Sequence, residues 1–177
     1  MSASATGAAE FKVFQFTIPF STRATDVYSM AQITSVAIIP IGMSRCGFRH
    51  SSAAVDTESN EITVLATTDR KPNTIDLSPD GRVLFVSNRG RNNPTSYYLP
   101  GPEWGSVLLV DTETGEMLDA IIGGNQTTGL EVSDDGTLLA FSDLLDNRVV
   151  VYSVPSTEEL LTGGGGRYED HLAELAK

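Results

Sequence analysis

The chain has 177 residues, of which 40% are hydrophobic and 20% charged, a composition that fits one folded domain and excludes a disordered chain. Twelve basic against 23 acidic residues give a net charge of −11, which argues against binding to nucleic acid or to anionic lipid. No apolar run approaches the ~20 residues that span a bilayer, and the N-terminus lacks the basic start and apolar core of a signal peptide.

Disulfide and metal chemistry have little support in the sequence. Cys46 is the only cysteine, so no internal disulfide can form. His50 and His171 are the only histidines, too few for a multi-histidine metal centre, and we expect both at the surface. The carboxylates of the last third lack the spacing of a calcium loop: Asp134, Asp135, Asp143 and Asp146. The sequence therefore predicts no metal and no cofactor.

The first third of the chain gives the weakest pattern. Residues 11–18 can form a strand, with no partner indicated. Residues 26–42 resemble a degenerate copy of the second half of the repeat described below. Residues 53–65 resemble the second half of the following repeat. The spacing between these two copies, from Val27 to Ala53, is shorter than one repeat needs. We therefore expect residues 1–54 to be an irregular or degenerate segment that carries a partial blade.

Residues 72–88 predict two antiparallel strands joined by the turn Ser78-Pro79-Asp80-Gly81. Proline presets φ, aspartate bonds the local backbone, and glycine accepts a positive φ. The turn returns without its proline at residues 133–136. Three later runs are apolar at nearly every residue: RVLFVS, SVLLVD and RVVVYSV. A strand with one face in water would alternate apolar and polar residues, so these three strands are predicted to be covered on both faces.

The chain repeats itself with two offsets. At a shift of 55, residues 55–88 match residues 110–143 with ten identities and no gap. At a shift of 42, residues 105–111 match residues 147–153. The difference between the two shifts predicts an insertion between Asn88 and Gly105. A unit of about 42 residues suits a propeller blade of four short strands.

Residues 72–154 resemble the YVTN-type β-propeller repeat, whose blades carry a Ser-Pro-Asp-Gly turn and a strand ending in Asp-x-x-Thr-Gly. Pro72, Ile75 and the 78–81 turn match its first half, and Val110-Asp111 and Thr114-Gly115 its second. The resemblance implies an all-β fold: a partial propeller, its C-terminal part, with about three four-stranded antiparallel blades over 55–155. Residues 156–177 are predicted to be a short helical tail, opened by a capping box at Ser156–Glu159.

The sequence leaves open what the helical tail contacts and what covers the outer faces of the end blades. Tyr168, Leu172 and Leu175 would share one face of the last helix, which either packs on the propeller or docks on a partner. Closed propellers of the resembled family have about seven blades. Three blades would leave apolar faces uncovered, so we expect either a longer parent protein or self-association.

Candidate binding residues crowd the insertion and one neighbouring loop. Two tyrosines, a tryptophan and two arginines would suit a sugar, a planar ligand or a peptide carboxylate, or else form a local mini-core. The polar loop 123–129 adds amides that either bind a ligand or satisfy a turn. The predicted set is Arg89, Arg91, Asn92, Tyr97, Tyr98, Glu103, Trp104, Asn125 and Gln126.

Three functions compete at this stage. The first is a non-enzymatic scaffold that binds an unknown protein or small molecule on a face around residues 89–104. The second, from the resemblance to phosphogluconolactonase-type propellers, is a lactonase-like hydrolase, for which Arg89, Arg91 and Glu103 are the only clustered candidates. The third is a non-functional fragment of a longer propeller protein. The resemblance implies a periplasmic or extracellular location.

Overall fold

The structure, a computed structural model, describes residues 14–17, 31–33, 36–41, 50–56, 59, 61–163 and 168–177. Within them lie three antiparallel sheets of four strands each, two short α-helices and a 3-10 helix at Leu144–Asp146. The predicted all-β partial propeller with a helical tail is thereby confirmed. Among the described residues, no helix is long and apolar enough to cross a membrane.

The first blade is formed by β2 (Ala31–Ile33), β3 (Val36–Ile41), β4 (Ser51–Asp56) and β5 (Ile62–Thr67), paired in that order. β3 pairs antiparallel with β4, from Val36 opposite Asp56 to Ile41 opposite Ser51. The interpretation of residues 26–42 as a second half-blade is therefore wrong. The hairpin β2–β3 supplies the first two strands of the same blade, because β3 continues the sheet that β4 and β5 complete.

The central blade is formed by β6 (Pro72–Leu77), β7 (Val83–Asn88), β8 (Ser106–Asp111) and β9 (Met117–Ile122). Every residue of β7 and β8 is buried. One face packs on the first blade through a cluster that includes Leu84, Leu108 and Ala66. The other face packs on the terminal blade through Phe85 and its neighbours. These two strands are thus covered on both faces, as the sequence predicts.

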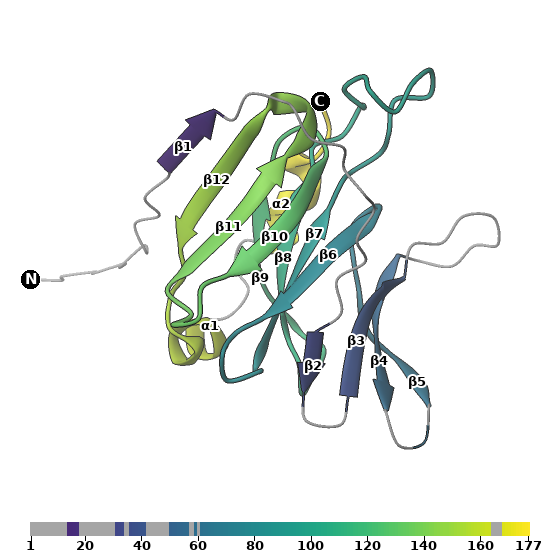
Figure 1. Cartoon of the computed structure of the whole chain (residues 1–177). Coiled ribbons are helices and arrows are strands. Elements are labelled where there is room, and N and C mark those ends of the chain that lie inside the picture. The colour runs from purple at the N-terminus through teal and green to yellow at the C-terminus, as the bar shows by residue number, and fades with distance from the viewer. Residues whose placement is uncertain are drawn as a thin grey trace, which may run out of the picture.

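The terminal blade is formed by β10 (Thr127–Val132), β11 (Leu138–Asp143), β12 (Arg148–Ser153) and β1 (Phe14–Thr17). β1 lies along β12 at the outer edge, with Phe14 opposite Val151 (Figure 1). A strand near the N-terminus therefore completes a blade made near the C-terminus. On β12 only Val150 is buried. The prediction that RVVVYSV is covered on both faces is wrong, because this blade has a blade neighbour on one side only among the described residues.

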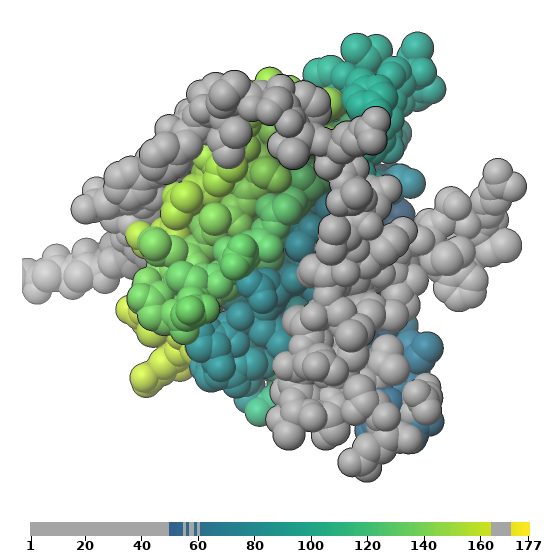
Figure 2. All heavy atoms as spheres, in the orientation of Figure 1, coloured from purple at the N-terminus to yellow at the C-terminus, as the bar shows by residue number. Residues whose placement is uncertain are grey.

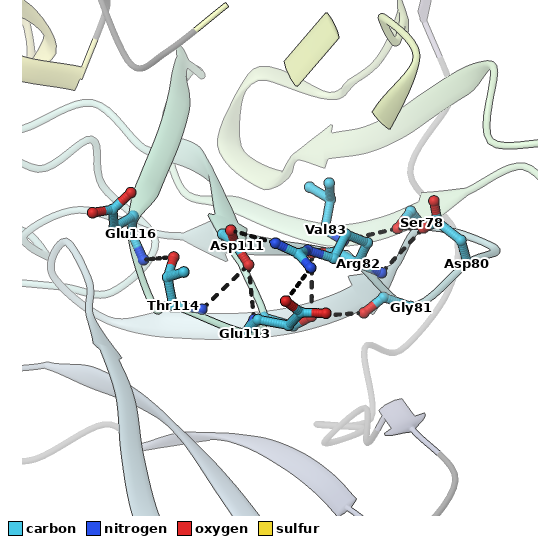
Figure 3. Close-up of polar contacts among 10 residues, drawn as sticks. Ser78, Asp80, Gly81, Arg82, Val83, Asp111, Glu113, Thr114 and Glu116 are labelled. Atoms are coloured by element: carbon cyan, nitrogen blue, oxygen red, sulfur yellow. Dashed lines mark hydrogen bonds and ion pairs between the residues drawn. The ribbon is translucent and has the colours of Figure 1, made fainter. Parts of the chain in front are cut away.

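The two copies of the turn have the same geometry. The Ser78 hydroxyl donates to Asp80 (2.5 Å) and accepts from the Val83 amide (2.9 Å), and Gly81 has φ +71° (Figure 3). In the terminal blade the corresponding distances from Ser133 are 2.7 and 2.9 Å, and Gly136 has φ +72°. Loss of proline therefore leaves the turn unchanged, because the serine and the aspartate hold it.

Arg82 links the turn at residues 111–116, between β8 and β9, to the 78–81 turn. Its guanidinium group donates to Asp111 (2.9 Å) and pairs with Glu113 (Figure 3). The Asp111 carboxylate also accepts from the Glu113 amide at 2.8 Å, and the Thr112 hydroxyl donates to the Gly81 carbonyl at 2.8 Å. The ends of strands β6 to β9 are thereby locked together at this side of the blade.

The tail contains α1 (Thr157–Gly163) and α2 (Tyr168–Glu174). The predicted capping box is present: Ser156 and Glu159 exchange hydrogen bonds, with the Glu159 carboxylate accepting from the Ser156 amide at 2.9 Å. Leu160 of α1 packs into the core between the central and terminal blades, beside a cavity of only about 10 Å³. That cavity is too small for an organic ligand.

Candidate functional site

The insertion connects β7 to β8 through residues 89–105, whereas residues 144–147 make the same connection in the terminal blade. The extra length equals the difference between the two repeat offsets, so the predicted insertion is confirmed. It projects from the body of the molecule as a knob, drawn in teal in Figure 2. Its conformation depends on three sets of contacts.

The first set holds Tyr97 at the base of the knob. The Arg89 guanidinium donates to the Tyr97 hydroxyl and lies 5.2 Å from the centre of its ring. The buried amide of Gln126, from the loop before β10, donates to the Tyr97 carbonyl at 2.6 Å. The structure therefore brings together three predicted site residues from two loops. Tyr97 is half-buried, and the Arg89 Nε and Gln126 Oε1 atoms beside it are buried without a hydrogen-bond partner.

The second set centres on Glu103. Its carboxylate accepts from the Arg91 amide at 3.0 Å and lies 3.5 Å from the Arg91 Nε and 3.4 Å from the Arg70 Nε. Gly90 and Gly101 allow the chain to pass this closely: a Cβ on Gly101 would stand 1.8 Å from the Arg91 carbonyl oxygen. Arg70, from the loop before β6, is a member of this cluster that sequence reasoning missed.

The third set joins the insertion to the C-terminal tail. Trp104 donates its amide to the Leu175 carbonyl (2.8 Å), and Glu103 forms an isolated antiparallel β-bridge with Ala176. The Lys177 ammonium lies 4.1 Å from the centre of the Trp104 ring, donates to the Gly101 carbonyl at 2.9 Å and contacts the Asn125 side chain. Burial lowers the pKa of Lys177, and nearby Asp146 opposes that shift. The tail therefore packs on the insertion.

A buried polar cluster anchors the same tail to the central blade. His171 of α2 is 2% exposed, and its Nε2 lies 2.8 Å from the Asp69 carboxylate. The Ser106 hydroxyl donates to the same carboxylate oxygen at 2.6 Å. The expectation that His171 lies at the surface is wrong. Its buried polar partner explains why: a histidine can leave water when a carboxylate satisfies its ring nitrogen.

Of the apolar face predicted for the last helix, Leu172 is 55% exposed and Leu175 is half-buried. Among the α2 side chains that the structure describes, the buried one is His171. The side chain of Tyr168 lies outside the described residues. Nothing in the periodicity could reveal this arrangement, because the residue that receives His171 is Asp69, 102 positions away.

The remaining predicted residues occupy different positions. Asn125 is engaged by Asp146, which accepts from its amide nitrogen (2.7 Å) and its side chain (2.6 Å). Asn92 is half-buried on the insertion. Tyr98 stacks edge-on against Tyr97 at 5.5 Å between ring centres, yet 78% of it is exposed, and Leu99 beside it is 47% exposed. The knob therefore has a fixed base and an uncovered apolar tip.

The site offers no assembled catalytic group. Arg89, Arg91 and Glu103, the candidates for hydrolysis, are engaged with Tyr97, Arg70 and one another. Among the described residues no three His, Cys, Asp or Glu side chains are grouped to hold a metal ion. The arrangement is a pinned loop that presents an aromatic and an aliphatic side chain.

Comparison with known proteins adds one relative in sequence. The chain is 51% identical over 83 residues to the protein named Antigen Lp49 of Leptospira interrogans serogroup Icterohaemorrhagiae serovar copenhageni, strain Fiocruz L1-130. The match covers 46% of this chain and 18% of that protein, so the chain spans less than a fifth of the relative's length. No protein-family model matches the chain.

Solved structures of similar shape include propellers. The Pan2 WD40 domain of Neurospora crassa is 11% identical with a TM-score of 0.47, covering 72% of this chain and 38% of that one. The Cps50 (Swd1) β-propeller domain of Myceliophteria thermophila is 14% identical with a TM-score of 0.45, covering 79% and 42%. The three four-stranded antiparallel sheets described above have the arrangement of propeller blades.

Proposed function

We propose that this chain is a non-enzymatic β-propeller scaffold that captures a protein partner on the tip of the 89–104 insertion. The observation that carries the proposal is the exposure of Tyr98 and Leu99 on a loop whose base is fixed. Tyrosine supplies a large contact area at a low cost in conformational entropy, and fixing a loop beforehand lowers the cost of binding. A convex tip suits a groove on a protein better than it suits a small molecule.

The base of the knob supports the same proposal. Tyr97 is held from two directions by Arg89 and Gln126, and Glu103 by two arginines and the tail. These contacts engage the Arg89 and Arg91 guanidinium groups, the Glu103 carboxylate and the Gln126 amide nitrogen within the molecule. We infer that Arg89, Arg91, Glu103, Trp104, Asn125 and Gln126 position the tip and that Asn92 adds to its rim, while Tyr98 and Leu99 contact the partner.

We also propose membership of the YVTN-type repeat family, supported by the Ser-Pro-Asp-Gly turn and the Asp111–Gly115 turn that follow its pattern. The relative is named as an antigen, which is in keeping with a surface that proteins recognise. From the family resemblance we also propose a periplasmic or extracellular location for this chain. Fractionation of the producing cells, followed by immunodetection, tests that location.

The binding test compares two matched substitutions of exposed residues. A photo-crosslinking residue placed at position 99 should give one discrete adduct in the producing cells. Tyr98→Ser should reduce that adduct at least tenfold, since a central aromatic contact is worth about 2 kcal/mol or more. Leu172→Ser, which changes an exposed leucine on α2, should leave it unchanged. Equal adducts from all three proteins would reject the tip as the binding surface.

The lactonase-like alternative makes a different prediction. A hydrolase needs a base that is free to activate water, and the Glu103 carboxylate is engaged by two guanidinium groups. We expect no turnover when the protein is incubated with a panel of sugar lactones. Turnover that disappears in Glu103→Gln would overturn the scaffold proposal in favour of catalysis.

A further inference from the structure

The outer faces of the first and terminal blades carry exposed apolar side chains. On β5, Ala66 pairs with Ser52 of β4, and Val64 pairs with the next residue of β4, Ala53. Because consecutive residues of a strand point to opposite faces and paired residues share a face, Val64 and Ala66 point to opposite faces. Ala66 packs on the central blade, which places Val64 and Ile62 on the face turned away from it. These two side chains are 63% and 62% exposed. On the terminal blade, Leu138 is 44% exposed.

Counterparts of these residues in the central blade are covered by a neighbouring blade. Leu138 corresponds to Val83 at the shift of 55, and Val83 is fully buried against the terminal blade. Ile62 corresponds to Met117, which packs in the cluster that joins the central blade to the first. Leu138 and Ile62 therefore occupy opposite halves of one type of interface, which the molecule already forms twice.

A polar position repeats in the same way. Asp76 of β6 accepts a hydrogen bond across the blade boundary from the amide of Val132 on β10, at 2.7 Å. Its counterpart in the terminal blade is Glu131, which is exposed. A carboxylate in this position can accept from the inner strand of a further blade. In the first blade, that inner strand is β2.

We propose that two copies of this chain associate head to tail, with the first blade of each packing on the terminal blade of the other. The interface continues the blade-on-blade packing inside each chain. Such a heterologous contact closes only if the rotation completes a ring. Propellers have about four to eight blades. With the three blades that the structure describes in each chain, two copies close a six-bladed ring, whereas three copies exceed the range.

Light scattering on a sizing column measures the assembly directly. We expect a particle of twice the chain mass of 18.9 kDa. Because each copy carries a net charge of −11, the dimer should strengthen as added salt screens their repulsion. A mass that stays at that of a single chain from low to high protein concentration would overturn the proposal, and so would an open-ended series of larger species.

A charge exchange between the two faces tests the head-to-tail arrangement. Leu138→Lys alone and Ile62→Glu alone should each be monomeric, because both contacts in a homodimer would hold a charge against an apolar face. Mixed in equal amounts, the two variants should form a dimer, with one unchanged contact and one contact of opposite charges. Leu138→Lys mixed with Ile62→Lys is the matched control and should stay monomeric.

Folding of each variant is checked by circular dichroism, since both positions are exposed and should tolerate a charge in the monomer. If the Leu138→Lys and Ile62→Glu mixture stays monomeric while the unsubstituted chain is dimeric, the two faces do not meet and the proposal is wrong. Its failure would leave the proposed function of the insertion intact, because the Tyr98 test uses a different surface.

Discussion

The central and terminal blades follow the same repeat but differ in burial. In the central blade all residues of β7 and β8 are buried, while on β12 of the terminal blade only Val150 is buried. The apolar sequence of the strands is alike in both. The pattern therefore encodes a strand suited to lie between two layers, and the number of neighbouring layers decides how much of that apolar surface leaves water.

The largest expected difference concerns one pair of leucines. Leu84→Ala in the central blade should lower the free energy of unfolding by about 2–5 kcal/mol, because it leaves a cavity at a fully buried position. Leu138→Ala should cost the monomer less than about 1 kcal/mol, since the side chain is half-exposed. Urea unfolding at low protein concentration measures both. Equal costs would contradict the exposure of Leu138 on the outer face of the terminal blade.

The outer edge of the central blade is covered by α2 and that of the terminal blade by β1. His171→Ala should lower the free energy of unfolding by about 1–3 kcal/mol, because Asp69 loses a buried partner. Hydrogen exchange at the Trp104 and Lys177 amides should speed up as the tail loosens. Leu172→Ala on the same helix serves as the control. Unchanged exchange at Trp104 in His171→Ala would mean that the β-bridge alone holds the tail.

Alanine substitutions in the two equivalent turns distinguish the cost of a left-handed backbone from the cost of a steric clash with the adjacent blade. Gly81→Ala should cost about 1–2 kcal/mol, the cost of placing an alanine at a left-handed φ. Gly136→Ala should cost more, because its Cβ would also stand 2.9 Å from the Pro79 ring of the adjacent blade. Thermal unfolding of the two variants compares them. A smaller effect at Gly136 would contradict the close approach of the turns.

The smallest expected effect is the acid titration of these turns. Hydrogen bonds from the Ser133 hydroxyl and from Thr137 lower the pKa of Asp135 to about 2, and the Ser78 hydroxyl lowers that of Asp80. Because the folded-state pKa lies below the unfolded one, the stabilisation is complete above about pH 4 and is lost as the pH falls toward 2. Carboxyl-carbon NMR should place the Asp135 midpoint near 2. A midpoint near 4 would mean that the turn is open in solution.

Local patterns in the sequence predicted what depends on neighbouring residues. The turns, the strands of the central blade, the capping box and the length of the insertion all follow from short-range chemistry or from the comparison of the chain with itself. The role of residues 26–42 was mistaken, because a hairpin of apolar residues fits either half of a blade. Register against β4 decides between them, and no local signal carries it.

The composition of the insertion predicted the residues of the candidate site, but their contacts depend on partners that are distant in the sequence. The sequence located the aromatic and arginine residues but left open which of them face solvent. Glu103 is engaged by Arg70, and the insertion by the tail at Ala176, pairs that are 33 and 73 positions apart. Such long-range contacts decide that Tyr97 is part of the base and Tyr98 part of the tip.

The pairing of β1 with β12 has a consequence for how the chain is made. Phe14 leaves the ribosome long before Val151, the residue it will face, has been added. The first and central blades can pack during synthesis, whereas the last sheet must wait for both of its ends. Closure over so long a loop is slow. β1 is thus synthesised well before β12 and is placed only after it, and until then the edge of β12 is open to any other extended peptide.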